Sequence, residues 1–125
     1  MVQTDKSNDE NTAVLEETIS YLENRGFENI KADIEGYETP KSFKRQSTGN
    51  DITPDIVAEK HGLKYIFEVS LKSAKPRLLK TKWLLFDTLT KIKDYKFRIV
   101  TKSGHMKFTQ NMIDSVNINK EFIRI

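Results

Sequence analysis

Cysteine is absent from this sequence of 125 residues, and histidine occurs only as His61 and His105. These absences exclude disulfide scaffolds, cysteine-type zinc sites, thiol nucleophiles and a histidine-rich metal centre. Long apolar runs are also missing, since the longest, Trp83–Phe86, is far too short to span a bilayer. The opening residues, MVQTDKSNDENT, are polar and acidic, without the apolar core of a signal peptide. We therefore expect a cytoplasmic protein that has no membrane-spanning segment.

The composition is that of a globular chain, with 37% apolar and 31% charged residues. A chain of this length can bury one hydrophobic core but not two. We expect a flexible N-terminal tail over residues 1–9 and a single domain over residues 10–125.

The charges are distributed unevenly. Residues 1–39 contain ten acidic and three basic side chains, a net charge of −7, whereas residues 40–125 contain eight acidic and eighteen basic ones, a net charge of +10. A basic segment of this kind is typical of proteins with an anionic partner, most often nucleic acid. Alternatively, the two segments neutralise each other across the fold.

Hydrophobic periodicity predicts an α/β domain with the element order α-β-β-β-α-β-α-β. A long polar connection over residues 36–53 separates the first strand from the second. Helices are expected over residues 9–25, 77–93 and 108–116, and strands over 27–34, 55–59, 64–71, 96–101 and 121–125.

The second expected helix has an apolar and a basic side. Trp83 is most simply a core or interface residue. The buried stripe is expected to comprise Leu78, Leu79, Leu85, Phe86, Leu89 and Ile92, and the lysines expected to point to water are Lys80, Lys82, Lys91 and Lys93.

Two strand-like runs within residues 54–72 flank a turn at residues 61–62, which predicts a β-hairpin. A two-residue turn places Glu59 opposite Lys64, an oppositely charged pair that supports this register. The side expected to pack on the core pairs Ala58 with Tyr65, Ile56 with Phe67 and Pro54 with Val69.

The same register places Asp55 directly opposite Glu68 among apolar side chains. Two such carboxylates repel each other, so the pair costs stability unless a proton or a cation lies between them. Mg²⁺ binds proteins through one or two carboxylates together with water and phosphate oxygens. The pair is therefore a candidate metal site; alternatively, one carboxylate lies at a frayed strand end and is solvated.

Strand alternation places Lys72 on the same face as Glu68 and Ser70, about 13 Å from Glu68 along the strand. A lysine beside a metal-bound water can lower the pKa of that water and stabilise a phosphorane-like transition state. Lys72 is therefore a candidate catalytic residue, with a solvated surface lysine as the alternative.

Pro54-Asp55, followed thirteen residues after Asp55 by Glu68 at the end of an apolar strand, resembles the motif of the PD-(D/E)XK nuclease superfamily. The order helix–strand–hairpin–helix–strand is similar to the core of restriction endonucleases and archaeal Holliday-junction resolvases. A helix that carries Glu16 and Glu17 and ends in Gly-Phe is similar to the resolvases in particular. The resemblance covers residues 10–101, and it implies a restriction endonuclease-like core in which helices flank a mixed central sheet.

Carried over by residue, the resemblance makes Asp55 and Glu68 the ligands of Mg²⁺ or Mn²⁺, with Glu17 as an assisting catalytic carboxylate. The sequence departs from the family at Ser70, where the motif has its lysine. Since the family is known to relocate this lysine, Lys72 is the expected replacement, and Lys75 and Lys82 are less favoured alternatives.

Basic residues in two regions are expected to contact phosphates. One group lies in the long connection, and the other lies where the sheet leads into the second helix. The residues predicted to bind nucleic acid are Lys44, Arg45, Lys75, Arg77 and Lys80.

Taken together, the carboxylate pair, the basic residues and the resemblance predict a Mg²⁺-dependent nuclease that hydrolyses DNA. Two alternatives stay open. One is a module of the same fold that binds nucleic acid without cutting it, because Ser70 replaces the lysine. The other is a protein-interaction domain that forms a homodimer through its acidic and basic surfaces.

Overall fold

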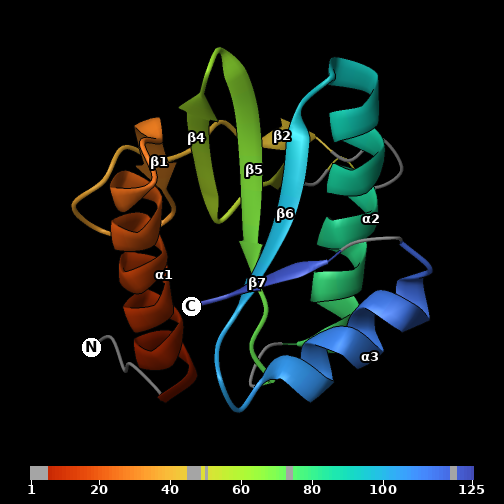
Figure 1. The fold of residues 1–125 in the computed structure, drawn as a ribbon. Helices are drawn as coiled ribbons and strands as arrows, with labels where there is room; N and C mark the ends of the chain where they lie inside the picture. The colour runs from red at the N-terminus through yellow and green to blue at the C-terminus, as the bar shows by residue number, and fades with distance from the viewer. Residues whose placement is uncertain (1–5, 45–48, 50, 73–74, 119–120) are drawn as a thin grey trace.

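The computed structural model describes residues 6–44, 49, 51–72, 75–118 and 121–125 (Figure 1). Arg45, one of the predicted phosphate-binding residues, lies outside these ranges. The helices are α1 (Lys6–Asn24), α2 (Pro76–Lys93) and α3 (Met106–Val116). The strands are β1 (Glu28–Ala32), β2 (Phe43–Lys44), β3 (Asp51–Ile52), β4 (Ile56–Lys60), β5 (Leu63–Val69), β6 (Lys96–Thr101) and β7 (Phe122–Arg124).

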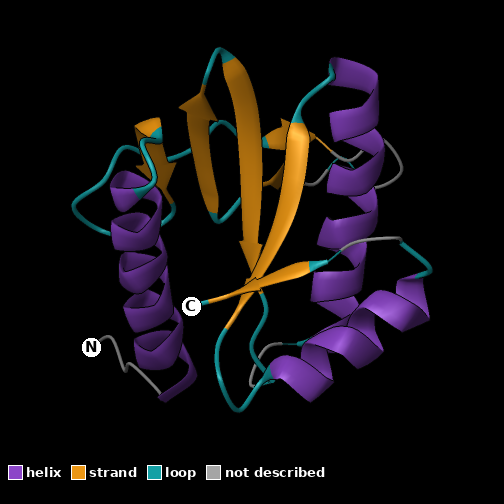
Figure 2. Cartoon of the chain, in the orientation of Figure 1, coloured by secondary structure: helices purple, strands orange, loops and turns teal. Residues whose placement is uncertain are grey.

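The architecture is mixed α/β, as the sequence predicts. Five strands form one sheet in the order β1-β4-β5-β6-β7, with helices on either side (Figure 2). Strands β1, β4 and β5 are antiparallel neighbours, whereas β6 runs parallel to β5 and β7 parallel to β6. Helix α2 makes the crossover between the parallel strands β5 and β6.

Both faces of the sheet are buried. Helix α1 covers one face, where its Leu15 belongs to the same core cluster as Phe67 of β5. Helices α2 and α3 cover the other, where Trp83 belongs to a cluster with Ile66 of β5 (Figure 1). Successive residues of a strand point to opposite faces, so Glu68 lies on the α2 side, like Ile66.

The predicted hairpin register is confirmed, because Glu59 pairs with Lys64 and Val57 with Ile66. The turn residues His61 and Gly62 have φ angles of 53° and 78°. Positive φ at both central positions is the requirement of a type I′ turn, which glycine meets without strain. The turn chemistry therefore fixes the register that brings the two carboxylates together.

The predicted long loop contains a short ribbon instead of only irregular chain. Strands β2 and β3 pair there, with Phe43 opposite Ile52. The Phe43 ring contacts Phe86 of α2 edge-on, with 6.1 Å between ring centroids. Two apolar residues in a polar stretch are too weak a periodic signal to predict a strand.

The apolar stripe of α2 differs from the prediction. Its buried residues are Leu79, Trp83, Phe86 and Thr90. Leu78 is 52% exposed and Ile92 77% exposed, so both were wrongly assigned to the core. The buried face is rotated towards Trp83 because this side chain, the largest in the helix, fills the space against the sheet. Within the described residues, no helix is both long and apolar enough to cross a membrane.

Candidate metal and catalytic site

Asp55 and Glu68 lie side by side at the open end of the β4–β5 hairpin, and each is fixed by a backbone hydrogen bond. The Asp55 N–H donates to Glu68 Oε2 at 2.8 Å, and the Val69 N–H donates to Asp55 Oδ2 at 2.9 Å. These bonds engage one oxygen of each carboxylate. The other two oxygens, Asp55 Oδ1 and Glu68 Oε1, are left for a shared cation.

Lys82 of α2 supplies that cation. Its Nζ lies 3.2 Å from Asp55 Oδ1 and 3.0 Å from Glu68 Oε1. The Lys82 and Asp55 side chains are 14% and 16% exposed, and that of Glu68 is completely buried. Within the described part of the chain, Glu68 Oε1 has no hydrogen-bond donor at a suitable angle. Its contact is the ion pair with the Lys82 ammonium.

Burial raises the pKa of Glu68 from its ordinary value of 4.5 to about 8, and the nearby charge of Asp55 adds to the shift. The Lys82 charge and the hydrogen bond from the Asp55 N–H oppose this rise without cancelling it. Burial lowers the pKa of Lys82, but the charges of Glu68 and Asp55 outweigh that effect and raise it above its ordinary value. The ammonium thus stays charged, and Glu68 is the member of this cluster that takes up a proton more readily than an ordinary glutamate.

The arrangement fits a hard divalent cation. Asp55 Oδ1, just before β4, and Glu68 Oε1 of β5 face one point, the position of the Lys82 ammonium. Among the described residues, no group of three or more His, Cys, Asp or Glu side chains could hold a metal. A cation here would be held by these two carboxylates, with water and phosphate oxygens completing its shell, as Mg²⁺ commonly is.

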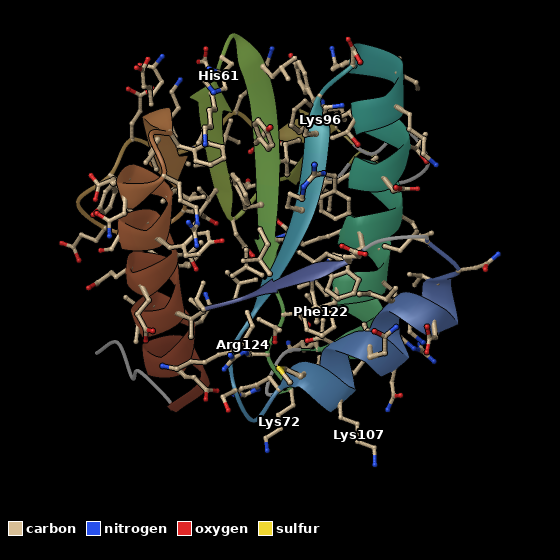
Figure 3. All side chains as sticks on the ribbon, viewed as in Figure 1. His61, Lys72, Lys96, Lys107, Phe122 and Arg124 are labelled. Carbon is tan, nitrogen blue, oxygen red and sulfur yellow. The ribbon has the colours of Figure 1, made fainter. Side chains whose placement is uncertain are left out.

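Lys72, the lysine expected at this site, lies elsewhere. Strand β5 ends at Val69, so the alternation that would place Lys72 beside Glu68 does not continue to it. Its backbone N–H donates to His105 Nδ1 at 2.9 Å, and its exposed side chain extends away from the sheet (Figure 3). The structure therefore brings Lys82, not Lys72, to the carboxylate pair.

Glu17 is also separated from the pair. It lies on α1, which covers the face of the sheet opposite to the one that Glu68 and Lys82 share. Its Oε1 forms an ion pair with Lys102 Nζ at 2.6 Å, and both side chains are partly exposed. The assisting role predicted for Glu17 is therefore not supported by its position.

Ser70, which stands where the motif has its lysine, is completely buried. Thr109 Oγ1 donates to Ser70 Oγ at 2.8 Å, and Thr101 Oγ1 donates to the Ser70 carbonyl at 2.9 Å. This network joins β5 to β6 and α3. A lysine at this position would have to displace the Ser70 hydroxyl from this buried network.

Restoring the motif lysine is expected to fail. Ser70→Lys would place an ammonium in this completely buried network, which should lower the free energy of unfolding by more than about 3 kcal/mol. The control Ser70→Ala removes only hydrogen bonds and should cost about 1 kcal/mol. Urea denaturation measures both. A stable Ser70→Lys variant would contradict this expectation.

The predicted phosphate-binding residues of α2 separate around the helix. Lys75 caps its N-terminus and lies two turns before Lys82 on about the same side. Arg77 and Lys80 lie about 140° and 160° around the helix from Lys82. Lys44 of β2 is exposed and pairs with Asp51 of β3. Of the described candidates on α2, Lys75 is thus the one placed to assist the carboxylate site.

Lys82, expected from the sequence to point to water and only a less favoured alternative for the motif lysine, is the lysine that lies at the carboxylate pair. The signal that finds it is the burial of Trp83, since a helix that turns Trp83 to the sheet also turns Lys82 towards the hairpin. No family model matches this chain, and no match was found among curated proteins.

Proposed function

We propose that this protein is a Mg²⁺-dependent nuclease of the PD-(D/E)XK class that hydrolyses DNA phosphodiester bonds. The observation that carries the proposal is the position of Lys82 Nζ, within 3.2 Å of one oxygen of Asp55 and one of Glu68. Two carboxylates and a lysine are the three side chains that this class uses. The proposal also draws support from an antiparallel hairpin followed by a helical crossover to a parallel strand.

In this proposal the carboxylates of Asp55 and Glu68 would hold Mg²⁺ or Mn²⁺. The bound ion would activate a water and neutralise charge on the phosphate. The backbone N–H groups of Asp55 and Val69 keep the two carboxylates oriented whether or not Lys82 stays between them. Lys82, anchored on α2 beside the carboxylates, would stabilise negative charge on the attacking water or the phosphate.

A second candidate function is nucleic-acid binding without cleavage. Lys82 already neutralises both carboxylates, and Glu68 is completely buried. Such an ion-paired cluster can also be purely structural. In that case DNA would bind through the exposed lysines with strong dependence on salt, and divalent metal would change neither binding nor stability.

A cleavage assay separates the two candidates. The protein is incubated with Mg²⁺ or Mn²⁺ and with single-stranded, duplex and branched DNA. Wild type is expected to nick or cut at least one substrate, and Asp55→Asn should reduce cutting by at least about a hundredfold while DNA binding persists. Lys44→Gln, which lies outside the carboxylate site, is the matched control for loss of one phosphate contact.

Two outcomes contradict the proposal. Retained cutting by an Asp55→Asn, Glu68→Gln double variant would show that another site or a contaminant is responsible. Salt-dependent binding of all three DNA forms by wild type, with no cutting in either metal, would favour the binding module.

A further inference from the structure

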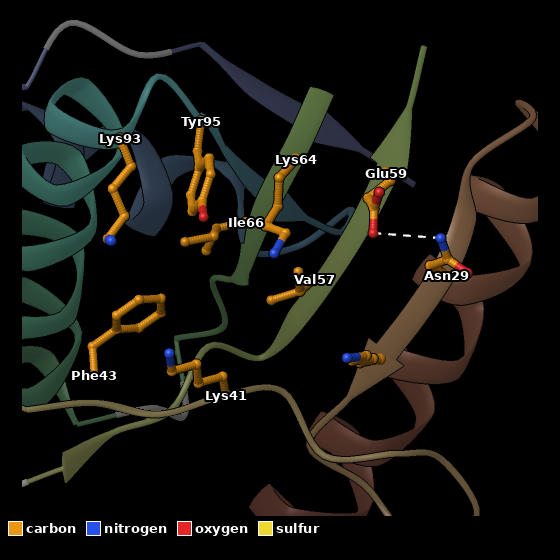
Figure 4. A pocket seen from close by; sticks show the side chains of 10 residues that line it. Asn29, Lys41, Phe43, Val57, Glu59, Lys64, Ile66, Lys93 and Tyr95 are labelled. Carbon is orange, nitrogen blue, oxygen red and sulfur yellow. Dashed lines mark hydrogen bonds between the residues drawn. The ribbon is translucent and has the colours of Figure 1, made fainter. Parts of the chain in front are cut away.

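A separate pocket opens on the α2 side of the sheet, beyond the carboxylate pair (Figure 4). Its floor is formed by Val57 of β4 and Ile66 of β5, and its volume is about 140 Å³. The remaining lining residues are Asn29, Lys31, Lys41, Phe43, Glu59, Lys64, Lys93 and Tyr95.

Two aromatic side chains stand on the walls of this pocket. Phe43 is held from behind by Phe86, and the Lys64 Nζ lies 5.3 Å from the centre of the Tyr95 ring. An apolar cavity of about 150 Å³ accepts benzene, so the space between these walls is suited to one six-membered ring. Aromatic walls and an aliphatic floor favour a flat, unsaturated guest.

The mouth of the pocket is cationic. Figure 4 shows the amino groups of Lys41, Lys64 and Lys93 directed towards the space between Phe43 and Tyr95. All three lysines are exposed, and no ion pair within the described residues involves them. The three lysines thus favour a planar ligand with a negatively charged group beside its ring, such as a nucleotide.

One edge of the pocket is polar, because Asn29 and Glu59 can form hydrogen bonds with a bound molecule. Asn29 Nδ2 donates to Glu59 Oε2 at 3.4 Å, a long bond that leaves both groups able to bond elsewhere. Asn29 has a positive φ of 51° and lies where the β1–β4 register shifts between Glu28 and Lys31. Such bulges re-aim side chains, and here the side chain lines the pocket.

Glu68 and Ile66 lie two residues apart on the same face of β5, so the pocket floor is about 7 Å from the carboxylate pair. We propose that the pocket receives one unpaired nucleobase, preferably a pyrimidine, of a DNA strand whose backbone lies at Asp55 and Glu68. The inference rests on the proposed function and adds the substrate class: DNA with an unpaired base near the cut, because a base stacked in a continuous duplex cannot enter.

The test measures binding without cleavage, in EDTA, by fluorescence anisotropy. The probes are a thymidine oligonucleotide of about 12 residues and an oligonucleotide of equal length whose central sugars carry no base. Wild type is expected to bind the thymidine probe about tenfold more tightly. Tyr95→Leu should abolish most of this preference, while Tyr37→Leu, an exposed tyrosine outside the pocket, should retain it.

A charge variant tests the mouth of the pocket separately. Lys93→Gln should weaken binding of both probes alike and lower the slope of affinity against salt by about one. Equal affinity of wild type for the two probes would overturn the inference without any reliance on how the variants fold. If wild type cuts DNA but binds both probes equally, the base-binding role of the pocket is wrong and the nuclease function stands. If wild type prefers the thymidine probe but does not cut, the nuclease function is wrong and base binding stands.

Discussion

Replacing Lys82 with methionine is expected to reduce metal-dependent cleavage by about a hundredfold to a thousandfold, whereas Lys72→Met should leave it within about twofold of wild type. Methionine keeps most of the aliphatic stem that packs beneath the hairpin but removes the ammonium that lies 3.0 Å from Glu68 and 3.2 Å from Asp55. Lys72 is exposed and directed away from the site, so its charge acts only through solvent.

A loss of cleavage by Lys82→Met must be distinguished from a loss of folded protein. Lys82→Met leaves two facing carboxylates without a counter-ion, which destabilises the metal-free fold. Thermal denaturation with and without Mg²⁺ and DNA binding in EDTA are therefore measured for both variants. A folded, DNA-binding Lys82→Met protein that cuts at the wild-type rate, or a Lys72→Met protein that does not cut, would overturn the assignment of the lysine.

The hairpin is the part of the fold that the sequence predicts best, because local chemistry determines it. A turn with Gly62 sets the register, and the Glu59–Lys64 pair is consistent with only one alignment. From that register follows the juxtaposition of Asp55 and Glu68. The sequence predicts a metal ion between the two carboxylates, and the structure places the ammonium of Lys82 there instead of the expected Lys72 nearby.

The error at Lys82 has a specific cause. In α2 the apolar residues are so dense that the predicted stripe spans more than one face: it joins the buried Leu79 and Phe86 to the exposed Leu78 and Ile92. The buried face instead follows Trp83, whose volume matters more than the number of leucines once the helix packs on a sheet. Which face of α2 packs on the sheet is decided by tertiary contacts, so counting hydrophobic positions within the helix does not predict it.

The prediction that Glu17 lies at the carboxylate pair is also wrong because of tertiary packing. Sequence periodicity places Glu17 beside the apolar stripe of α1 but does not say which face of the sheet the helix covers. Since α1 packs against Phe67 and α2 against Ile66, the two helices lie on opposite faces. Glu17 consequently pairs with Lys102, and it is α2 that brings a side chain, Lys82, to Glu68.

The stability of the metal-free protein is expected to decrease as the pH rises from about 4.5 to about 8, and Glu68→Gln should remove much of this decrease. The pKa of Glu68 is 4.5 when unfolded and about 8 when folded, so between these values the folded protein binds more protons than the unfolded chain. The free energy of unfolding must then fall with rising pH, and the stabilisation by the protonated form is complete only below pH 4.5.

Urea denaturation in EDTA at several pH values measures this effect as the difference between wild type and Glu68→Gln. The difference is expected to change across the window by an amount on the order of 4 kcal/mol, given about 1.4 kcal/mol for each pKa unit. Under the proposed function Mg²⁺ would bind only ionised Glu68, so adding it should stabilise wild type more at pH 8 than at pH 6, with no such gain for the variant. Parallel stability curves for the two proteins would show that Glu68 is ionised throughout, with Lys82 compensating its burial completely.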